Sequence, residues 1–515
     1  MQIYSFSPFG YEGSLVTVEV DLRRGIPAVD LVGLADGAVK EARERMQAAI
    51  RNSGFDFPQE RVLISLSPAD LRKEGAGFDL PIALGVLYAG KQLSNEESIS
   101  VEKDDILVMG ELELGGRVRP VRGVHAAVAT AMAAGIRRCI VPGGNAEEAR
   151  EIAGMKVFGA NNLEEAFEAL ENEEVFKEKF VPKDESIEDL DCDFVEGVAF
   201  SKIASGYEFN EVKGQSKLVR GLQFAAAGGH NLLAVGAPGC GKTMAIQKLP
   251  ALMPLLTVEE AQPVTRILSI AGLLNGKKSI VREAPFRMPH QTASIEGICG
   301  GGTNCRPGEI SLSHNGVLFL DEAAEFRTSV LQMLRVPLET GRITLCRAGR
   351  STVYPADFQL IMAANPCPCG NYGSKTKLCL CSARSVELYW KKFSAPLLDR
   401  VDLRVRIENE SGSNDSVSTE ELRIPIAKAV KIQRMRQGKK NSRLLPDEIV
   451  KFCKLDKECQ AILNDASLRF GFSPRAVSSC LKLARTGADL AQSKDIRAED
   501  LVEAIDFRKE FIEEV

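Results

Sequence analysis

The residues best suited to chemistry form a glycine-rich segment near the middle of the chain. They directly follow an apolar run at 231–235 and are Gly236, Ala237, Pro238, Gly239, Cys240, Gly241, Lys242 and Thr243. Glycines let backbone N–H groups converge on phosphate oxygens, and a following helix points its positive end at the same anion. In this pattern the lysine reaches the β- and γ-phosphates and the threonine holds Mg²⁺. The segment therefore predicts a site for ATP and Mg²⁺, although an isolated glycine-rich turn is the simpler alternative.

A second segment carries two carboxylates at the end of an apolar run. Residues 316–320 are strand-like, and Asp321 and Glu322 follow them. Asp321 would hold the water shell of Mg²⁺, and Glu322 would polarise the attacking water. A buried strand does not need a terminal acid pair, so a merely solvated strand end explains the pair less well than catalysis does.

Three further polar residues complete a hydrolytic set. An apolar strand at 358–364 ends at Asn365, whose amide would lie between the acid pair and the γ-phosphate; this resembles the sensor position of AAA+ ATPases. Arg400 resembles the arginine finger that stabilises transition-state charge in a neighbouring subunit's site. Arg475, at the start of a late helix, resembles the second sensor. A salt-bridged or exposed arginine is the commoner alternative for each, and the ordered set favours catalysis.

Four cysteines follow Asn365 in the pattern C-x-C-x9-C-x-C. They are Cys367, Cys369, Cys379 and Cys381. Residues two apart in extended chain point to one side, so each pair can present two thiolates to one metal ion. The pattern predicts a structural Zn²⁺ site without an open position for catalysis. Free or redox-paired thiols are the alternative.

A basic hairpin offers a surface for nucleic acid. Residues 342–355 read as two strands with a turn at Ala348-Gly349, and Arg347 and Arg350 flank the turn. In a ring of subunits such hairpins would place arginines around a central channel, where they neutralise phosphates without reading bases. A solvated hairpin is the alternative. The net charge of −5 gives the whole chain no attraction to nucleic acid.

Composition and the order of patterns predict a multidomain globular protein. With 515 residues, 44% of them hydrophobic, the chain is too long for one core. Ala-rich helical stretches and β-branched runs predict an α/β domain over 1–170, followed by an acidic linker at 171–200. Residues 201–410 form the expected ATPase core and 411–515 an all-helical lid. No segment resembles a membrane span or signal peptide, which predicts a cytoplasmic protein with reduced thiols.

Several long motifs resemble the YifB/ComM-type Mg-chelatase-like AAA+ ATPases. The segments that carry this resemblance are Leu31–Asp36, Phe286–Ser294, Gly300–Gly302, Arg306–Glu322, Asn365–Gly370 and Leu483–Leu490. The resemblance extends over essentially the whole chain. One departure is Gln291, where the family tends to carry a second histidine, and it places any metal or catalytic role of the pair in doubt.

The resemblance implies a fold, an activity and partners. It implies an N-terminal domain of Lon-protease-like (ribosomal S5 domain 2-like) fold, an AAA+ P-loop core and a helical lid. It also implies a homo-hexameric motor on branched or single-stranded DNA, of the ComM type that is associated with branch migration during recombination and natural transformation. A metal-chelatase-like or MoxR-like ATPase that remodels a protein partner is the alternative.

A Lon-type protease is less compatible with the residues. Such proteases use a serine activated by a lysine. The segment at 72–81, which includes Asp79, has no serine at the nucleophile's place, and His125 stands where the lysine is expected. We therefore expect a proteolytically inactive domain in which His125 is an ordinary surface histidine.

Overall fold

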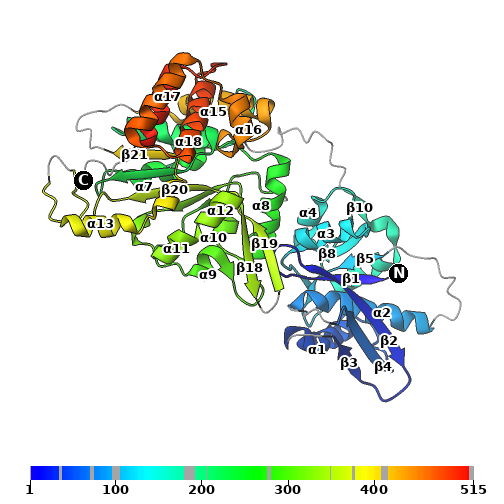
Figure 1. Cartoon of the computed structure of the whole chain (residues 1–515). Helices are drawn as coiled ribbons and strands as arrows, with labels where there is room; N and C mark the ends of the chain where they lie inside the picture. Colours follow the sequence, from blue (N-terminus) through cyan, green and yellow to red (C-terminus); the bar gives the residue numbers. More distant parts are fainter. Residues whose placement is uncertain are drawn as a thin grey trace.

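The computed structural model describes most of the chain. The described residues are 2–33, 37–69, 73, 75–94, 105–178, 192–204, 206–274, 280–347, 350–373, 377–407 and 416–509. The expected hairpin turn at Ala348-Gly349 lies outside them, as does most of the polar loop expected after residue 410. The chain forms an N-terminal α/β part, a central α/β part and a C-terminal helical part, in that order in space as well as in sequence (Figure 1).

The N-terminal part is built on an eight-stranded mixed sheet in the order β10-β9-β8-β5-β1-β2-β4-β3. Alternating burial in β4 points Val62, Ile64 and Leu66 into the core, because successive side chains of a strand face opposite sides. The strands are β1 (Ile3–Ser7), β2 (Ser14–Arg23), β3 (Val29–Val32), β4 (Arg61–Ser67), β5 (Ile106–Val108), β8 (Arg138–Pro142), β9 (Lys156–Ala160) and β10 (Lys177–Glu178). The helices are α1 (Gly37–Asn52), α2 (Asp79–Ser94), α3 (Val124–Ala133), α4 (Ala146–Arg150) and α5 (Leu163–Glu171).

The expected linker at 171–200 contains ordered structure at both ends. On its N-terminal side, β10 pairs with β9 and so belongs to the first sheet. On its C-terminal side, β11 (Cys192–Val195) and β12 (Val198–Ser201) form an antiparallel hairpin with Phe200 fully buried. The acidic composition suggested solvent, but the apolar residues at 198–200 have a core to enter. Strands are therefore present at both ends of the expected linker, and residues 179–191 lie outside the described part of the chain.

The central part is a five-stranded parallel sheet in the order β14-β17-β20-β13-β21. Its inner strands are continuous buried apolar runs, as expected for a parallel sheet covered on both faces. The strands are β13 (Leu232–Gly236), β14 (Phe286–Arg287), β17 (Val317–Leu320), β20 (Gln359–Ala364) and β21 (Leu403–Ile407). The helices are α6 (Ser216–Gly228), α7 (Lys242–Gln247), α8 (Val258–Ala271), α9 (Ile295–Cys299), α10 (Glu309–Leu312), α11 (Thr328–Met333), α12 (Arg335–Thr340), α13 (Ala383–Lys391) and α14 (Ala395–Leu398).

The predicted basic hairpin is present, as β18 (Arg342–Arg347) and β19 (Arg350–Pro355), with Arg347 opposite Arg350. It lies where the central part meets the N-terminal part (Figure 1). The turn between β1 and β2 docks there: Tyr11 N donates to Thr352 Oγ1 over 3.0 Å, and Gly10 N donates to Asn304 O over 3.2 Å. Gly10 has φ +58°, and a Cβ at that position would lie 2.2 Å from Thr352 Oγ1, so this contact requires glycine.

A second contact joins α3 and α4 to α8. Glu148, which is largely buried, accepts hydrogen bonds from the hydroxyl of Ser269 on α8 and from the backbone N–H of His125 on α3. Gly123 N also donates to Ser269 O over 3.3 Å. The N-terminal part therefore contacts the central part at the hairpin, at Asn304 and at α8.

The C-terminal part is helical, as predicted. It contains α15 (Thr419–Gln437), α16 (Pro446–Phe452), α17 (Lys457–Phe470), α18 (Pro474–Leu490) and α19 (Ala498–Arg508). Ser418 caps α15 with a capping box completed by Glu421. In the ranges that the structure describes, no helix combines the length and the apolar character needed to cross a membrane.

A buried carboxylate holds this helical part together. Asp489, with 0% exposure, accepts hydrogen bonds from Arg436 (2.7 and 2.8 Å), Arg485 (3.1 Å) and Asn441 (2.8 Å). The network connects α18 to α15 and to the turn that follows α15. Asp489 and Arg485 both belong to the family-like segment Leu483–Leu490, so that segment has a structural role.

We predict that Asp489→Ala destabilises the helical part by about 3 kcal/mol, because it leaves two arginines of a buried ion pair without their partner. Amide hydrogen exchange of α18 measures this destabilisation locally. Glu499→Ala on α19 is the matched control: its side chain is 71% exposed, and the change should stay within about 0.5 kcal/mol. Equal protection of α18 in both variants would contradict the structural role.

Candidate nucleotide-binding site

The phosphate-loop residues lie at the carboxyl end of β13, at the start of α7. Gly239 and Gly241 adopt φ of +77° and +82°, which glycine reaches without steric cost. Gly241 precedes Lys242 as the N-cap of α7. Ligands of open parallel sheets bind outside the carboxyl ends of the strands. The loop therefore has the position and the backbone conformation of a phosphate cradle.

The Lys242 side chain is held inside this loop. Its Nζ donates to Gly236 O over 2.7 Å and to Ala237 O over 3.0 Å. It also lies 3.3 Å from Oδ1 of Asn365, which directly follows β20. The ammonium and the side-chain amide of the predicted sensor therefore lie side by side, and the roles of both residues toward a γ-phosphate stay predictions.

Thr243 and Asp321 meet at the same edge of the sheet. Thr243 Oγ1 donates to both carboxylate oxygens of Asp321, over 3.1 and 3.0 Å. A hydroxyl and a carboxylate side by side are hard oxygen ligands, and Mg²⁺ prefers such ligands together with water and phosphate oxygens. These two residues fit the metal that the sequence implied and would hold it beside the phosphates.

Glu322 follows in a strained backbone conformation. Its φ and ψ are both 47°, in the left-handed region that costs a non-glycine residue on the order of 1 kcal/mol or more. Its N–H donates to Asp321 Oδ1 over 3.0 Å. Such strain is concentrated at functional sites. The predicted base therefore lies directly beside Asp321, the predicted metal ligand.

The two predicted arginines lie at the other end of the strands. The backbone O of Arg400 accepts from Asn231 Nδ2, at the amino end of β13, over 2.8 Å. Ser473, the N-cap of α18, donates to Asp399 Oδ1 over 3.1 Å and so brings Arg475 to the same region. Because β13 has five residues of about 3.3 Å each, roughly 16 Å separates this end from the phosphate loop. Neither arginine lies at its own chain's phosphate loop.

The carboxylate of Glu339 lies near three arginines, Arg400, Arg475 and Arg335, which we call the arginine cluster. The Arg400 guanidinium donates a hydrogen bond to Glu339, which follows the first turn of α12. Arg400 is the main cause that lowers the pKa of Glu339, and Arg475 and Arg335 add to it. Arg335 was not predicted from the sequence. Arg335 is distant from Arg400 and Arg475 in the sequence, so only the structure shows that the three cations lie close to Glu339.

The hairpin arginines differ in their surroundings. Arg347 is exposed, whereas Arg350 is half-buried and holds its guanidinium 3.5 Å from the ring centroid of Phe9. Phe9 belongs to the turn between β1 and β2. Arg350 is therefore engaged in the contact between the two α/β parts, and Arg347 is the freer of the two cations.

The four cysteines gather on the segment between β20 and α13. Their sulfur atoms all lie within 4.8 Å of one another. No disulfide joins any cysteine among the residues described; all thirteen are free. The predicted grouping of the two pairs is thus present, and the ion remains a prediction.

His125 and Asp79 of the N-terminal part are both buried. The expectation that His125 lies on the surface is wrong, because the ring is only 4% exposed at the interface of α3 with α8. Burial, reinforced by Arg266, lowers its pKa to about 4, so it is neutral at pH 7. Asp79 is fully buried and paired with Arg45 over 2.9 and 3.0 Å. Neither residue forms a serine–lysine dyad.

Two other histidines are also buried. Burial lowers the pKa of His314 to about 4, and its Nδ1 accepts a hydrogen bond from Asp357 N over 3.0 Å. His230 lies 2.8 Å from Thr486 of α18. His290 is exposed and contacts Thr292, next to Gln291, so this family-like segment shows no pair of histidine ligands.

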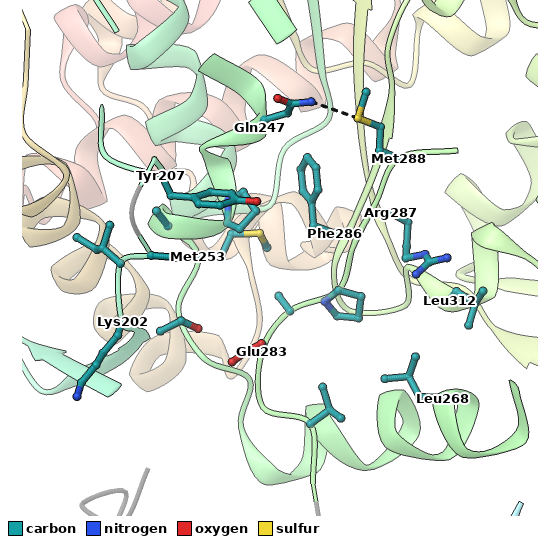
Figure 2. Close-up of a pocket in the computed structure, with 18 residues that line it drawn as sticks. Lys202, Tyr207, Gln247, Met253, Leu268, Glu283, Phe286, Arg287, Met288 and Leu312 are labelled. Atoms are coloured by element: carbon teal, nitrogen blue, oxygen red, sulfur yellow. Dashed lines mark hydrogen bonds between the residues drawn. The ribbon is translucent and has the colours of Figure 1, made fainter. Parts of the chain in front are cut away.

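A cavity of about 760 Å³ lies at the far end of α7. Figure 2 shows Tyr207, Phe286 and Met288 around it, with Gln247 donating to the sulfur of Met288 over 3.5 Å. None of the phosphate-loop residues lines it. It is mainly apolar and borders the strand β14, so it is separate from the phosphate site.

Sequence reasoning missed one residue that shapes the phosphate loop. Gln215, just before α6, donates to Cys240 O from Nε2. A Cβ at Gly241 would lie 2.4 Å from that nitrogen, so this side chain fits against a glycine. A polar residue 25 positions upstream of the loop carries no local signal of this contact.

The fold and this site define an AAA+ P-loop ATPase, and comparison with known proteins gives the family. The family model described as "Magnesium chelatase, subunit ChlI" matches residues 208–415, "Subunit ChlI of Mg-chelatase" matches 18–145, and "Magnesium chelatase, subunit ChlI C-terminal" matches 416–508. The chain is 38% identical to YifB of Escherichia coli over 98% of its own length and 96% of that protein. The chain belongs to the YifB/ComM family of Mg-chelatase-like proteins.

Other relatives agree with this assignment. The competence protein ComM of Haemophilus influenzae is 37% identical, with 98% of this chain and 97% of the relative covered. A Mycobacterium tuberculosis protein, Rv2897c, is 36% identical, with 98% of both chains covered. Lon protease of Desulforamulus reducens is 27% identical over 149 residues, which is 17% of that protein. The Lon-like fold expected for the N-terminal part is consistent with this match.

We predict that Lys242→Ala abolishes ATP binding, whereas Glu322→Gln still binds ATP and lowers its hydrolysis about 100-fold, because only the second change keeps the phosphate cradle. Binding of a fluorescent ATP analogue and phosphate release measure the two effects. Glu325→Gln, an exposed carboxylate three residues further on, is the matched control and should hydrolyse normally. Wild-type turnover by Glu322→Gln would show that this residue is not the base.

Proposed function

We propose that this chain is an ATP-driven motor that assembles into a homo-hexamer and acts on branched or single-stranded DNA, as a branch-migration helicase in recombination and natural transformation. The observation that carries the proposal is the separation of Arg400 and Arg475 from their own phosphate loop. Among the described residues, Lys242, Asp321, Glu322 and Asn365 gather at this site without Arg400 or Arg475, so a second copy of the chain would supply the arginine for the γ-phosphate.

The geometry of a ring supports this division. Phosphoryl transfer relies on positioned cations, and an arginine supplied from a neighbouring subunit increases turnover strongly. Arg400 reaches Glu339 at the surface of α12, and Arg475 is exposed beside it. A head-to-tail contact places this surface against the phosphate loop of the next copy, and such contacts close into rings.

DNA as the substrate is supported by the hairpin and by one relative. Arg347 is exposed at the end of β18 and is free to contact a phosphate. The net charge of −5 gives the chain as a whole no attraction to nucleic acid, so DNA binding would come from a local basic surface such as this one. The relative from Haemophilus influenzae carries the name competence protein. A motor on DNA accounts for both.

Remodelling of a protein partner is the second candidate. It is favoured by the three family models, which together cover most of the chain and are named for a magnesium chelatase subunit. A protein substrate would use the same nucleotide site. The two candidates differ in what stimulates hydrolysis: branched or single-stranded DNA for the motor, and a partner protein for the chelatase-like enzyme.

We expect Arg400→Ala subunits mixed with Lys242→Ala subunits to recover part of the ATPase activity that each variant lacks alone, because some junctions join an intact arginine to an intact phosphate loop. The steady-state rate across mixing ratios measures this recovery. The matched control mixes Lys242→Ala with Glu322→Gln; every phosphate site is then defective, and no recovery is expected. Well-formed mixed rings that remain inactive in both cases would contradict action between subunits.

We further expect Arg347→Ala to weaken DNA binding and to reduce the salt slope by about 1 for each phosphate that the arginine neutralises, with basal ATPase unchanged. DNA affinity measured over a range of salt concentrations tests this. Arg342→Ala removes an exposed arginine at the other end of the same strand and is the control. Arg350 is not suited to the test, since its removal also disrupts the contact with Phe9.

An Arg347→Ala variant with wild-type affinity and salt slope would exclude the hairpin as the DNA contact. Failure of the unmodified protein to bind any DNA structure in the presence of an ATP analogue would exclude the DNA motor itself and favour the protein-remodelling enzyme.

A further inference from the structure

Two cysteine pairs lie together immediately after the sensor Asn365. Cys367 and Cys369 come from one side of the segment between β20 and α13, and Cys379 and Cys381 from the other. Cys367 Sγ lies 3.4 Å from Cys369 Sγ and 3.7 Å from Cys379 Sγ, and Cys369 Sγ lies 3.6 Å from Cys379 Sγ. In the described part of the chain, no other group of three or more cysteine, histidine or carboxylate side chains converges in this way.

These separations match one metal ion with four sulfur ligands. Zinc–sulfur bonds of about 2.3 Å in a tetrahedron place the sulfur atoms about 3.8 Å apart. The distances are far longer than the roughly 2.0 Å of a disulfide bond. Three sulfur atoms at this spacing, with a fourth within 4.8 Å of each, offer the donor set of a closed, structural zinc site.

We propose that Cys367, Cys369, Cys379 and Cys381 bind one Zn²⁺, and that this zinc site holds the turn from Cys367 to Gly370 against the phosphate loop. Binding releases the thiol protons to solvent, so that thiolates surround the ion and no position is open for a substrate. The site therefore has a supporting role for the nucleotide site and no chemistry of its own.

Contacts made by the same segment carry the second half of the proposal. Gly370 lies directly on the phosphate loop: a Cβ there would be 2.4 Å from Cδ of Pro238. Gly370 has φ +76°, and its N–H donates to Cys367 O over 2.9 Å, in a tight turn that contains the first two ligands. The turn that presents two of the thiols is thus the turn that contacts the phosphate loop.

The ends of the segment are also attached to the site. Cys367 is two residues from Asn365, whose side chain contacts Lys242. Trp390 of α13 donates from Nε1 to Pro366 O over 3.1 Å. Because one ion connects residues near both ends, its removal would release the turn on Pro238 and loosen the position of Asn365.

The zinc content of the full-length protein, purified without chelators, tests the site itself. We expect about one zinc per chain in the unmodified protein. Cys379→Ser and Cys381→Ser should lose most of it, whereas Cys346→Ser, an exposed cysteine outside the group, should keep it. Replacement by Co²⁺ should give the sulfur-to-cobalt absorption of a tetrahedral thiolate site. A zinc-free protein with four free thiols, or with disulfides between these cysteines, would overturn the proposal.

The affinity for a fluorescent ATP analogue tests the effect on the phosphate loop. We expect several-fold weaker binding in Cys379→Ser and unchanged binding in Cys346→Ser. Gly370→Ala keeps all four ligands but adds a methyl group against Pro238, so it should retain zinc and still weaken nucleotide binding. Zinc-free Cys379→Ser protein that binds the analogue like the unmodified protein would overturn the supporting role, whatever the DNA or protein substrate is.

Discussion

The contact between Thr243 and Asp321 is the one on which the rest of the structure depends. It joins the first turn of α7 to the carboxyl end of β17, two strands away from β13 in the sheet. Because β13, β20 and β17 run parallel, their carboxyl ends meet at one edge, and the phosphate loop, Asn365 and the acid pair follow those ends. The order of the strands, more than any single residue, assembles the nucleotide site.

The same parallel arrangement explains why the two predicted arginines lie far from the phosphate loop of their own chain. Arg400 precedes β21 and Arg475 opens α18, and both lie at the amino ends of the strands. A side chain at one end of a buried strand cannot reach a ligand at the other end. In this chain Arg400 pairs with Glu339, and the Arg400 side chain is only 10% exposed. The completion by a second copy that we propose would follow from this direction of the sheet.

The N-terminal part is attached to the elements nearest the proposed DNA contact. The ring of Phe9 lies over the guanidinium of Arg350, and the ring centroid of Tyr11 lies 4.5 Å from the guanidinium carbon of Arg266 on α8. Glu148 accepts a hydrogen bond from Ser269. These contacts combine aromatic rings, cations and a buried carboxylate. A movement of the hairpin or of α8 would therefore also displace the residues of the N-terminal part that contact them. The domain that the sequence predicts to be proteolytically inactive is thereby in direct contact with the ATPase core.

The sequence by itself determined the local chemistry: the phosphate loop, the acid pair after a strand, the sensor asparagine, the basic hairpin, the helical C-terminal part and the family. Each of these is encoded within a few consecutive residues, as a strand, a turn or a cap, and the structure places them as local patterns predict. Only the tertiary structure decided which distant residues meet. The tertiary structure shows that His125 is buried and that Arg335 joins the arginine cluster. It also shows that Arg350 contacts Phe9, that Gly370 packs on Pro238, and that residues 192–200 of the expected linker are part of a β-hairpin. Burial and partners come from packing between segments far apart in the chain, and a sequence read locally does not contain those contacts.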